Sequence, residues 1–128
     1  MSMTPAVAQA IAELTAQFPD SVVTATESGD GGAWVHVDPV PIGNRFTHPT
    51  SWVAFHLTFT YPDADVYPHF VRADLVRVDG QGLGEGFSST TFGPDATPAI
   101  QISRRSPETL RNDATAKLIK VLDWMRDR

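Results

Sequence analysis

The chain has 128 residues, of which 41% are hydrophobic and 20% charged, proportions typical of a globular protein. A chain of this length is expected to form a single domain, residues 1–128, and to bury a core without metal or disulfide staples. The absence of cysteine excludes a disulfide framework, a thiolate zinc site, an iron–sulfur cluster and a cysteine nucleophile. No apolar run is long enough to span a bilayer and the first residues lack a signal peptide's basic start, so we expect a cytoplasmic protein without a membrane partner.

The formal net charge of −5 is unevenly distributed along the chain. The first 64 residues carry six acidic side chains and one basic side chain, whereas the remaining residues carry nine of each. A weakly acidic chain without a basic block is a poor nucleic-acid binder, so we expect no nucleic-acid partner. Any contact with an anion is expected from the C-terminal half.

The first helix has clear start and stop signals. Thr4 is a candidate N-cap, and Pro5 suits the first helical position because its missing N–H would be unpaired there anyway. Pro19 is expected to end the helix. The apolar residues between them recur at spacings of four, three and four, which predicts one buried stripe. This stripe consists of Val7, Ile11, Leu14 and Phe18.

Two segments with strand patterns follow the helix. Residues 21–27 and 33–40 are separated by a turn-forming cluster of glycine, serine and aspartate, and they are expected to form a hairpin. In the second segment Trp34 and His36 fall on the face opposite to Val35.

The strongest strand pattern lies in residues 51–60. Its large apolar side chains face one way, whereas Trp52 and His56 face the other, so we expect one face on the core and one wetter face. A fourth strand is expected over residues 70–78. The apolar face of residues 51–60 consists of Val53, Phe55, Leu57 and Phe59.

The C-terminal third is less regular. Residues 79–98 hold five of the nine glycines, which predicts a long loop, with an optional short strand at 86–92. After a short apolar run, a final helix is expected to begin at Ser106 or to be capped by Asn112. Its apolar face would consist of Leu110, Ala114, Leu118, Val121, Leu122 and Met125.

The order of these elements is a helix, four strands, a long Gly-rich loop and a helix. A block of consecutive strands favours an α+β fold with a four-stranded antiparallel meander over βαβ units. We expect the C-terminal helix to pack on one face of this sheet.

This element order, with a Tyr-Pro-rich loop directly after the third strand, resembles the ubiquitin-conjugating-enzyme (E2, or UBC) fold and its non-catalytic relatives, the RWD domains. The residues that carry the resemblance are Phe59-Thr60-Tyr61-Pro62 and Tyr67-Pro68. The resemblance covers most of the chain by element order and implies a protein partner, either a ubiquitin-like protein or an activating-enzyme-like protein. Bacterial E2-like proteins occur in ubiquitin-like conjugation and antiviral-defence operons, and the Arg-over-Lys usage here would suit a high-GC bacterium.

The catalytic residue of that family does not carry over to this chain. Conjugating enzymes place a cysteine in a short apolar run after the fourth strand, and the most similar run here is Ile100-Gln101-Ile102. A glutamine amide cannot form a thioester, and the His-Pro-Asn element that precedes the cysteine is missing. The sequence therefore predicts a non-catalytic interaction domain without a cofactor. The alternative is an active conjugating enzyme whose cysteine has been replaced in this chain.

The densest positive point of the chain is expected to contact the partner. Two arginines there lie at or before a helix N-terminus, and such an arrangement can hold a carboxylate or phosphate. The alternative is that these arginines pair with nearby acidic side chains on the surface. The predicted partner-binding residues are Arg104, Arg105, Gln101, Tyr61, Tyr67 and His69.

Two further functions are compatible with the sequence. The first is a small-molecule-binding or hydrolytic α+β domain with a polar pocket on the sheet face, which would use His36 and His56 and be lined by Trp34 or Trp52. The second is an immunity-type partner whose acidic N-terminal half meets a basic protein. The histidines lack the spacing of a metal motif, so no metal site is expected.

Overall fold

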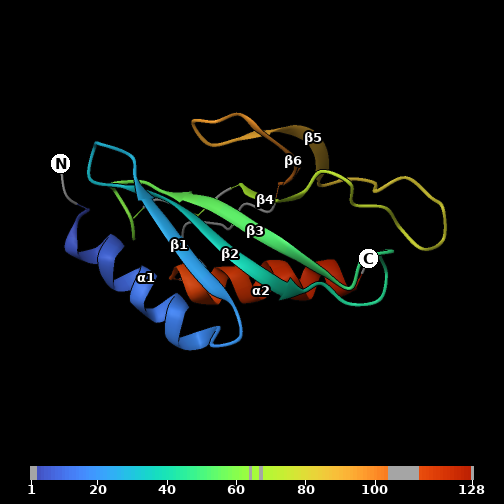
Figure 1. The fold of residues 1–128 in the computed structure, drawn as a ribbon, viewed down its shortest axis with the longest axis horizontal. Helices are drawn as coiled ribbons and strands as arrows, with labels where there is room; N and C mark the ends of the chain where they lie inside the picture. Colours follow the sequence, from blue (N-terminus) through green and yellow to red (C-terminus); the bar gives the residue numbers. More distant parts are fainter. Residues whose placement is uncertain (1–2, 64, 67, 104–112, 128) are drawn as a thin grey trace.

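The computed structural model describes residues 3–63, 65–66, 68–103 and 113–127 (Figure 1). Within these residues there are two helices, one near each end of the chain, and six strands between them. The helices are α1 (Pro5–Gln17) and α2 (Ala114–Arg126). The strands are β1 (Val22–Glu27), β2 (Ala33–Pro41), β3 (Thr50–Leu57), β4 (His69–Arg72), β5 (Phe87–Phe92) and β6 (Thr97–Ile102).

The six strands form one antiparallel sheet in the order β1-β2-β3-β4-β6-β5. The first four strands are neighbours in chain order, and the β5–β6 hairpin then joins β4 through its second strand. The fold is of the predicted α+β class, but the predicted UBC/RWD-like arrangement, a four-stranded meander followed by a Gly-rich loop, is wrong. The reason is that two further strands extend the sheet beyond β4 and give it a crossed order at that edge.

The segment 79–98, which was expected to be a long Gly-rich loop with an optional short strand at 86–92, contains β5, which matches that strand, and the start of β6. The β5 sequence, Phe-Ser-Ser-Thr-Thr-Phe, has four exposed polar residues in succession and therefore no alternation of burial. Its ladder with β6 nevertheless runs without a break from Phe87, opposite Ile102, to Phe92, opposite Thr97. The partner strand, rather than a local pattern, defines β5.

The fourth strand is shorter than the predicted 70–78, because β4 ends at Arg72. The Arg72 side chain bends toward Asp74, with Nη2 donating to Oδ2 at 3.0 Å, and the chain turns there. Farther along, the amide of Thr47 donates to the carbonyl of Val76 at 2.8 Å. The second half of the predicted strand thus pairs with the loop between β2 and β3 instead of continuing the sheet.

The start of α1 confirms the prediction. The Thr4 hydroxyl accepts a hydrogen bond from the amide of Val7 at 3.2 Å, and Pro5 is the first helical residue. The helix ends at Gln17, close before the proline that was expected to stop it.

The described part of α2 begins with Asp113 as its N-cap, whose Oδ1 accepts from the amide of Ala116 at 2.8 Å. The predicted starts at Ser106 and Asn112, and the predicted apolar position Leu110, lie outside the described residues.

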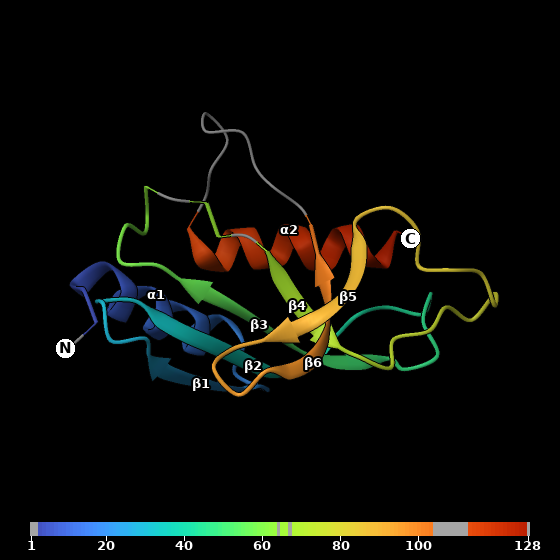
Figure 2. The same cartoon turned by 90° about the horizontal axis from the view of Figure 1, so that it is seen from above.

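The core lies between the helices and one face of the sheet. Figures 1 and 2 show both helices beside the same face, whereas the turn between β5 and β6 bends toward the other face. The largest fully buried side chains include Leu14 of α1, Phe55 of β3 and Leu118 of α2. The face of the sheet away from the helices, called here the open face, is thus available for other contacts.

The alternation in β3 has the predicted consequence over most of the strand. Val53, Phe55 and Leu57 are fully buried, whereas Trp52 and His56 are half-buried on the open face. The prediction for Phe59 is wrong, because the strand ends at Leu57 and the Phe59 side chain is 57% exposed.

Gly32 lies where β2 begins and is tightly enclosed by backbone. A Cβ there would lie 2.4 Å from the carbonyl oxygen of Leu57 and 3.2 Å from Cα of Thr58. Gly32→Ala is therefore expected to lower the free energy of unfolding by about 1–3 kcal/mol, measured by urea denaturation. Gly82→Ala is the control, because nothing lies within 4 Å of a Cβ at that position. Equal stability of the two variants would contradict the close packing at Gly32.

Candidate functional site

The open face carries aromatic rings on two neighbouring strands. Trp34 and His36 come from β2, and Trp52 and His56 come from β3, because alternate residues of a strand share one face. Trp34 stacks on His56 with ring centroids 4.1 Å apart, and Trp52 stacks on His36 at 5.0 Å. Each indole is thus held in place by an imidazole of the adjacent strand.

The turn between β5 and β6 covers part of this face. Phe92, at the end of β5, meets Trp34 edge-on at 5.4 Å and Phe70 at 4.8 Å between ring centroids. The turn that follows has φ values of 76° at Gly93 and 53° at Ala96. The left-handed conformation is unfavourable for alanine, so the aromatic contacts of the hairpin help to hold the turn in a strained shape.

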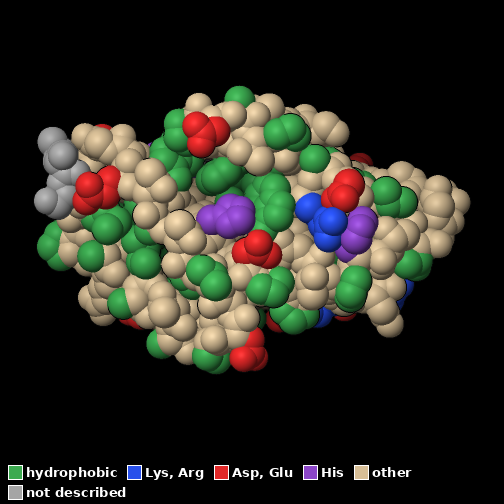
Figure 3. Space-filling view, in the orientation of Figure 1, with side chains coloured by type: hydrophobic (Ala, Val, Ile, Leu, Met, Phe, Trp, Pro, Cys, Tyr) green, Lys and Arg blue, Asp and Glu red, His purple; other side chains and the backbone are tan. Residues whose placement is uncertain are grey.

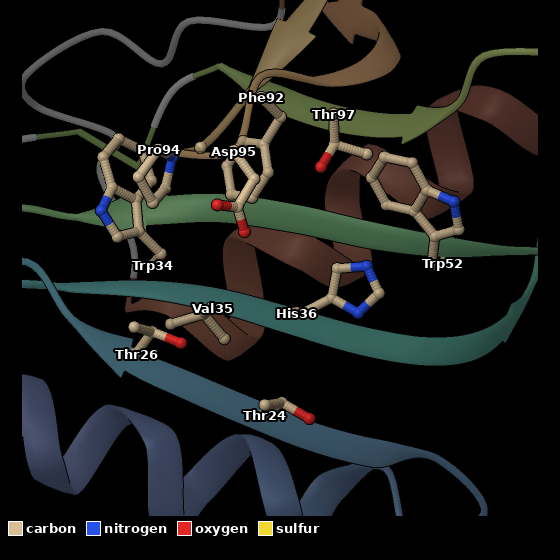
Figure 4. A pocket seen from close by; sticks show the side chains of 11 residues that line it. Thr24, Thr26, Trp34, Val35, His36, Trp52, Phe92, Pro94, Asp95 and Thr97 are labelled. Carbon is tan, nitrogen blue, oxygen red and sulfur yellow. The ribbon is translucent and has the colours of Figure 1, made fainter.

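The rings and the turn enclose a hollow of about 170 Å³ on the open face. Figure 4 shows the Asp95 carboxylate directed over the sheet, with the Trp34 indole on one side and His36 and Trp52 on the other. The hollow therefore combines aromatic walls with one carboxylate and several hydroxyl groups. Its side chains include Trp34, Trp52, Phe92, Pro94, His36, Asp95, Thr24, Thr26 and Thr97.

Both imidazoles of the open face favour the neutral form. Burial lowers the pKa of His36 below its ordinary value, and the opposing effect of Asp38 is smaller. Burial likewise lowers the pKa of His56, against a smaller opposing effect of Asp30. At neutral pH these rings therefore contribute flat, uncharged surfaces to the face.

A shallower, more polar pocket adjoins the hollow and shares Trp52 and Thr97 with it. Arg72 lies in this second pocket, where Nη2 donates to Asp74 at 3.0 Å and Nη1 donates to the carbonyl of Thr50 at 3.2 Å. The hydrogen bond to Asp74 raises the pKa of Arg72, and the same bond lowers the pKa of Asp74. Figure 3 shows basic, acidic and histidine side chains close together at one place on this face.

The structure places two of the predicted partner-binding residues in the core. The Tyr61 hydroxyl accepts a hydrogen bond from the amide of Ala114 at 3.0 Å, and its ring is largely buried. His69 is fully buried and lies against Phe55 at 5.1 Å. These positions give both residues a packing role, and their role in partner binding stays a prediction.

The other predicted residues fall into two groups. Gln101 is half-buried on β6, where its amide nitrogen donates to the hydroxyl of Ser103 at 3.2 Å. It lies opposite Phe70 of β4 and Ser88 of β5, so it occupies an interior strand of the sheet. The predicted residues outside the described part of the chain are Arg104, Arg105 and Tyr67.

A buried ion pair fastens the Tyr-Pro-rich segment to α2, and sequence reasoning missed it. Lys117 Nζ lies 3.1 and 3.3 Å from the two carboxylate oxygens of Asp65, with side-chain exposures of 3% and 8%. A signal for it was available, because Lys117 follows Ala114 by three residues and precedes Val121 by four, which places it on the apolar stripe of the helix.

The second hypothesis expected a polar sheet-face pocket with His36 and His56; the hollow found there is lined by Trp34, Trp52 and His36, but its walls are mainly aromatic and His56 does not line it. In the described parts of the chain, no three histidine or acidic side chains are grouped so that they could hold a metal ion. Nor does any helix in those parts have the length and apolar character to cross a membrane.

In comparisons with known proteins, no family model, curated protein or solved structure matches this chain.

Proposed function

We propose that this protein is a small-molecule-binding domain and that part of its ligand binds in the hollow on the open face. The observation that supports this function is the pair of indoles, each stacked on a histidine, at a hollow that faces solvent. The hydrophobic core lies on the other face of the sheet, so the core does not need these rings. Apolar walls with a few polar groups are typical of ligand sites.

The size of the hollow limits what it accepts. Its volume of about 170 Å³ is below the roughly 300 Å³ at which most ligand pockets begin. A single ring or a compact head group fits this space, and the rest of a larger ligand would lie over the adjoining polar pocket at Trp52 and Thr97.

A fragment screen followed by nuclear magnetic resonance tests this proposal. Bound fragments are expected to shift the indole N–H signals of Trp34 and Trp52. Trp52→Leu is expected to weaken binding up to about tenfold, because an aromatic contact is worth about 0.5–1.5 kcal/mol beyond its buried area. Phe59→Leu is the control, since Phe59 is an exposed aromatic residue outside the hollow. If no fragment shifts these two signals, the proposal fails.

Contact with a ubiquitin-like or activating-enzyme-like protein is a second proposal. It is supported by the Tyr-Pro residues of the sequence, and the Gln101 amide in place of a cysteine favours a non-catalytic role. A pull-down from the native host, combined with a thioester assay, tests it, and covalent loading of this chain would contradict the non-catalytic role. A cytoplasmic location belongs to this proposal and is tested by cell fractionation.

A further inference from the structure

The hollow is lined by a negative charge. Among the described residues that line the hollow, Asp95 is the one with a formal charge, because burial favours the neutral form of His36. The carboxylate points over the sheet between the aromatic rings, as Figure 4 shows. Asp38 follows His36 on β2 and lies in the adjoining pocket, so a second carboxylate borders the same region. A ligand in the hollow therefore meets negative charge.

The basic group of the adjoining pocket does not offset this charge. Arg72 of the adjoining pocket is held by Asp74 through a charge-assisted pair and by the carbonyl oxygen of Thr50. An anion in the hollow would lie near Asp95, whereas the guanidinium is already engaged by another carboxylate. The net charge of −5 for the whole chain acts in the same direction.

The walls themselves attract cations. Tryptophan is the side chain whose ring face binds cations best, and the hollow has two indoles and the Phe92 ring. A neutral ligand would contact these rings. It would, however, displace water from the Asp95 carboxylate without replacing the interactions that the water makes with the carboxylate. A cation with an apolar outer surface satisfies the rings and the carboxylate together.

From this arrangement we propose that the hollow binds an alkylated ammonium head group of a small molecule, an inference that rests on the proposed binding function. The head group lies between the indoles of Trp34 and Trp52, and the carboxylate of Asp95 faces its positive charge. The small volume of the hollow suits a compact head group of this kind.

Choline and its uncharged isostere 3,3-dimethyl-1-butanol distinguish charge from shape. Both are titrated into the full chain while the indole N–H signals are recorded. Choline is expected to bind about 5- to 30-fold more tightly, because a cation–π contact is worth about 1–2 kcal/mol when desolvated. Asp95→Asn is expected to reduce choline affinity about 5-fold or more without weakening the binding of the isostere, which also shows that the variant is folded. Asp123→Asn, an exposed aspartate on α2, is expected to change neither affinity.

The outcomes separate this inference from the proposed function. Equal or tighter binding of the isostere would overturn the assignment of the ligand as a cation and leave the binding function in place. Binding of fragments in the hollow without binding of choline would also overturn that assignment and leave the binding function in place. If neither choline nor any fragment shifts the indole signals, the binding function itself fails. A trimethyllysine peptide is titrated in parallel, and tighter binding of the peptide than of choline would overturn the assignment to a small molecule.

Discussion

Replacing Lys117 with methionine is expected to lower the free energy of unfolding by about 3–5 kcal/mol. The Lys117 ammonium and the Asp65 carboxylate are both almost fully buried and lie 3.1 Å apart. Methionine keeps most of the side-chain volume but removes the positive charge, so the carboxylate stays in a poorly solvated place without its ammonium partner. Urea denaturation at pH 7 measures the effect as a lower midpoint.

Two further variants make the Lys117 result specific. Lys120→Met changes an exposed lysine of the same helix and is expected to alter stability by no more than about 0.5 kcal/mol. The double variant Asp65→Leu with Lys117→Met removes both buried charges and is expected to recover much of the loss. Equal losses for Lys117→Met and Lys120→Met would show that the buried pair contributes nothing.

Stability is expected to fall steeply as the pH is lowered below 6.5, because of His69. Burial lowers the pKa of His69 to about 3, and the positive charge of Lys117 acts in the same direction against the smaller effect of Asp65. The unfolded chain, with a histidine pKa near 6.5, then binds a proton that the folded protein does not. The contribution of His69 to the free energy of unfolding is complete above pH 6.5. Below that pH it falls by about 1.4 kcal/mol for each pH unit, down to about pH 3.

His69→Leu is expected to flatten this dependence. Neither ring nitrogen of His69 has a hydrogen-bond partner among the described residues, so leucine is also expected to maintain or raise stability at pH 7. His48→Leu, at a partly exposed histidine, is the control and is expected to keep the steep slope. Urea denaturation at several pH values between 7 and 4 gives both slopes. A His69→Leu protein that loses stability as steeply as the parent would contradict the role of His69.

The elements predicted well are those whose signals are local. α1 follows from Thr4, Pro5 and Pro19, which act within one turn of the helix. The alternation in β3 predicts which of its side chains face the core, but it does not predict the residue at which the strand ends. Phe59 continues the alternating pattern although the chain has already turned, with the amide of Tyr61 donating to the carbonyl of Thr58 at 3.0 Å.

The optional strand at 86–92 matches β5, but the way β5 and β6 extend the sheet beyond β4 was missed, because it depends on contacts that are distant in sequence. β5 has no alternation of its own and is a strand because β6 supplies its hydrogen-bond partners. Local alternation placed the aromatic rings of β2 and β3 on one face of the sheet. It could not assign Phe92 and Asp95 to the site. Their position depends on the turn between β5 and β6 bending over the sheet, which no local pattern encodes.

The hollow joins parts of the chain that meet only in the native state. Its walls come from β1, β2 and β3 on one side and from the β5–β6 turn on the other, so no short stretch of unfolded chain contains both Trp34 and Asp95. A ligand of this site therefore binds the folded form alone, and its binding energy appears in the folding equilibrium. At a free concentration one hundred times its dissociation constant, such a ligand stabilises the fold by about 2.7 kcal/mol. The melting temperature of the protein would consequently report how much of its ligand is present.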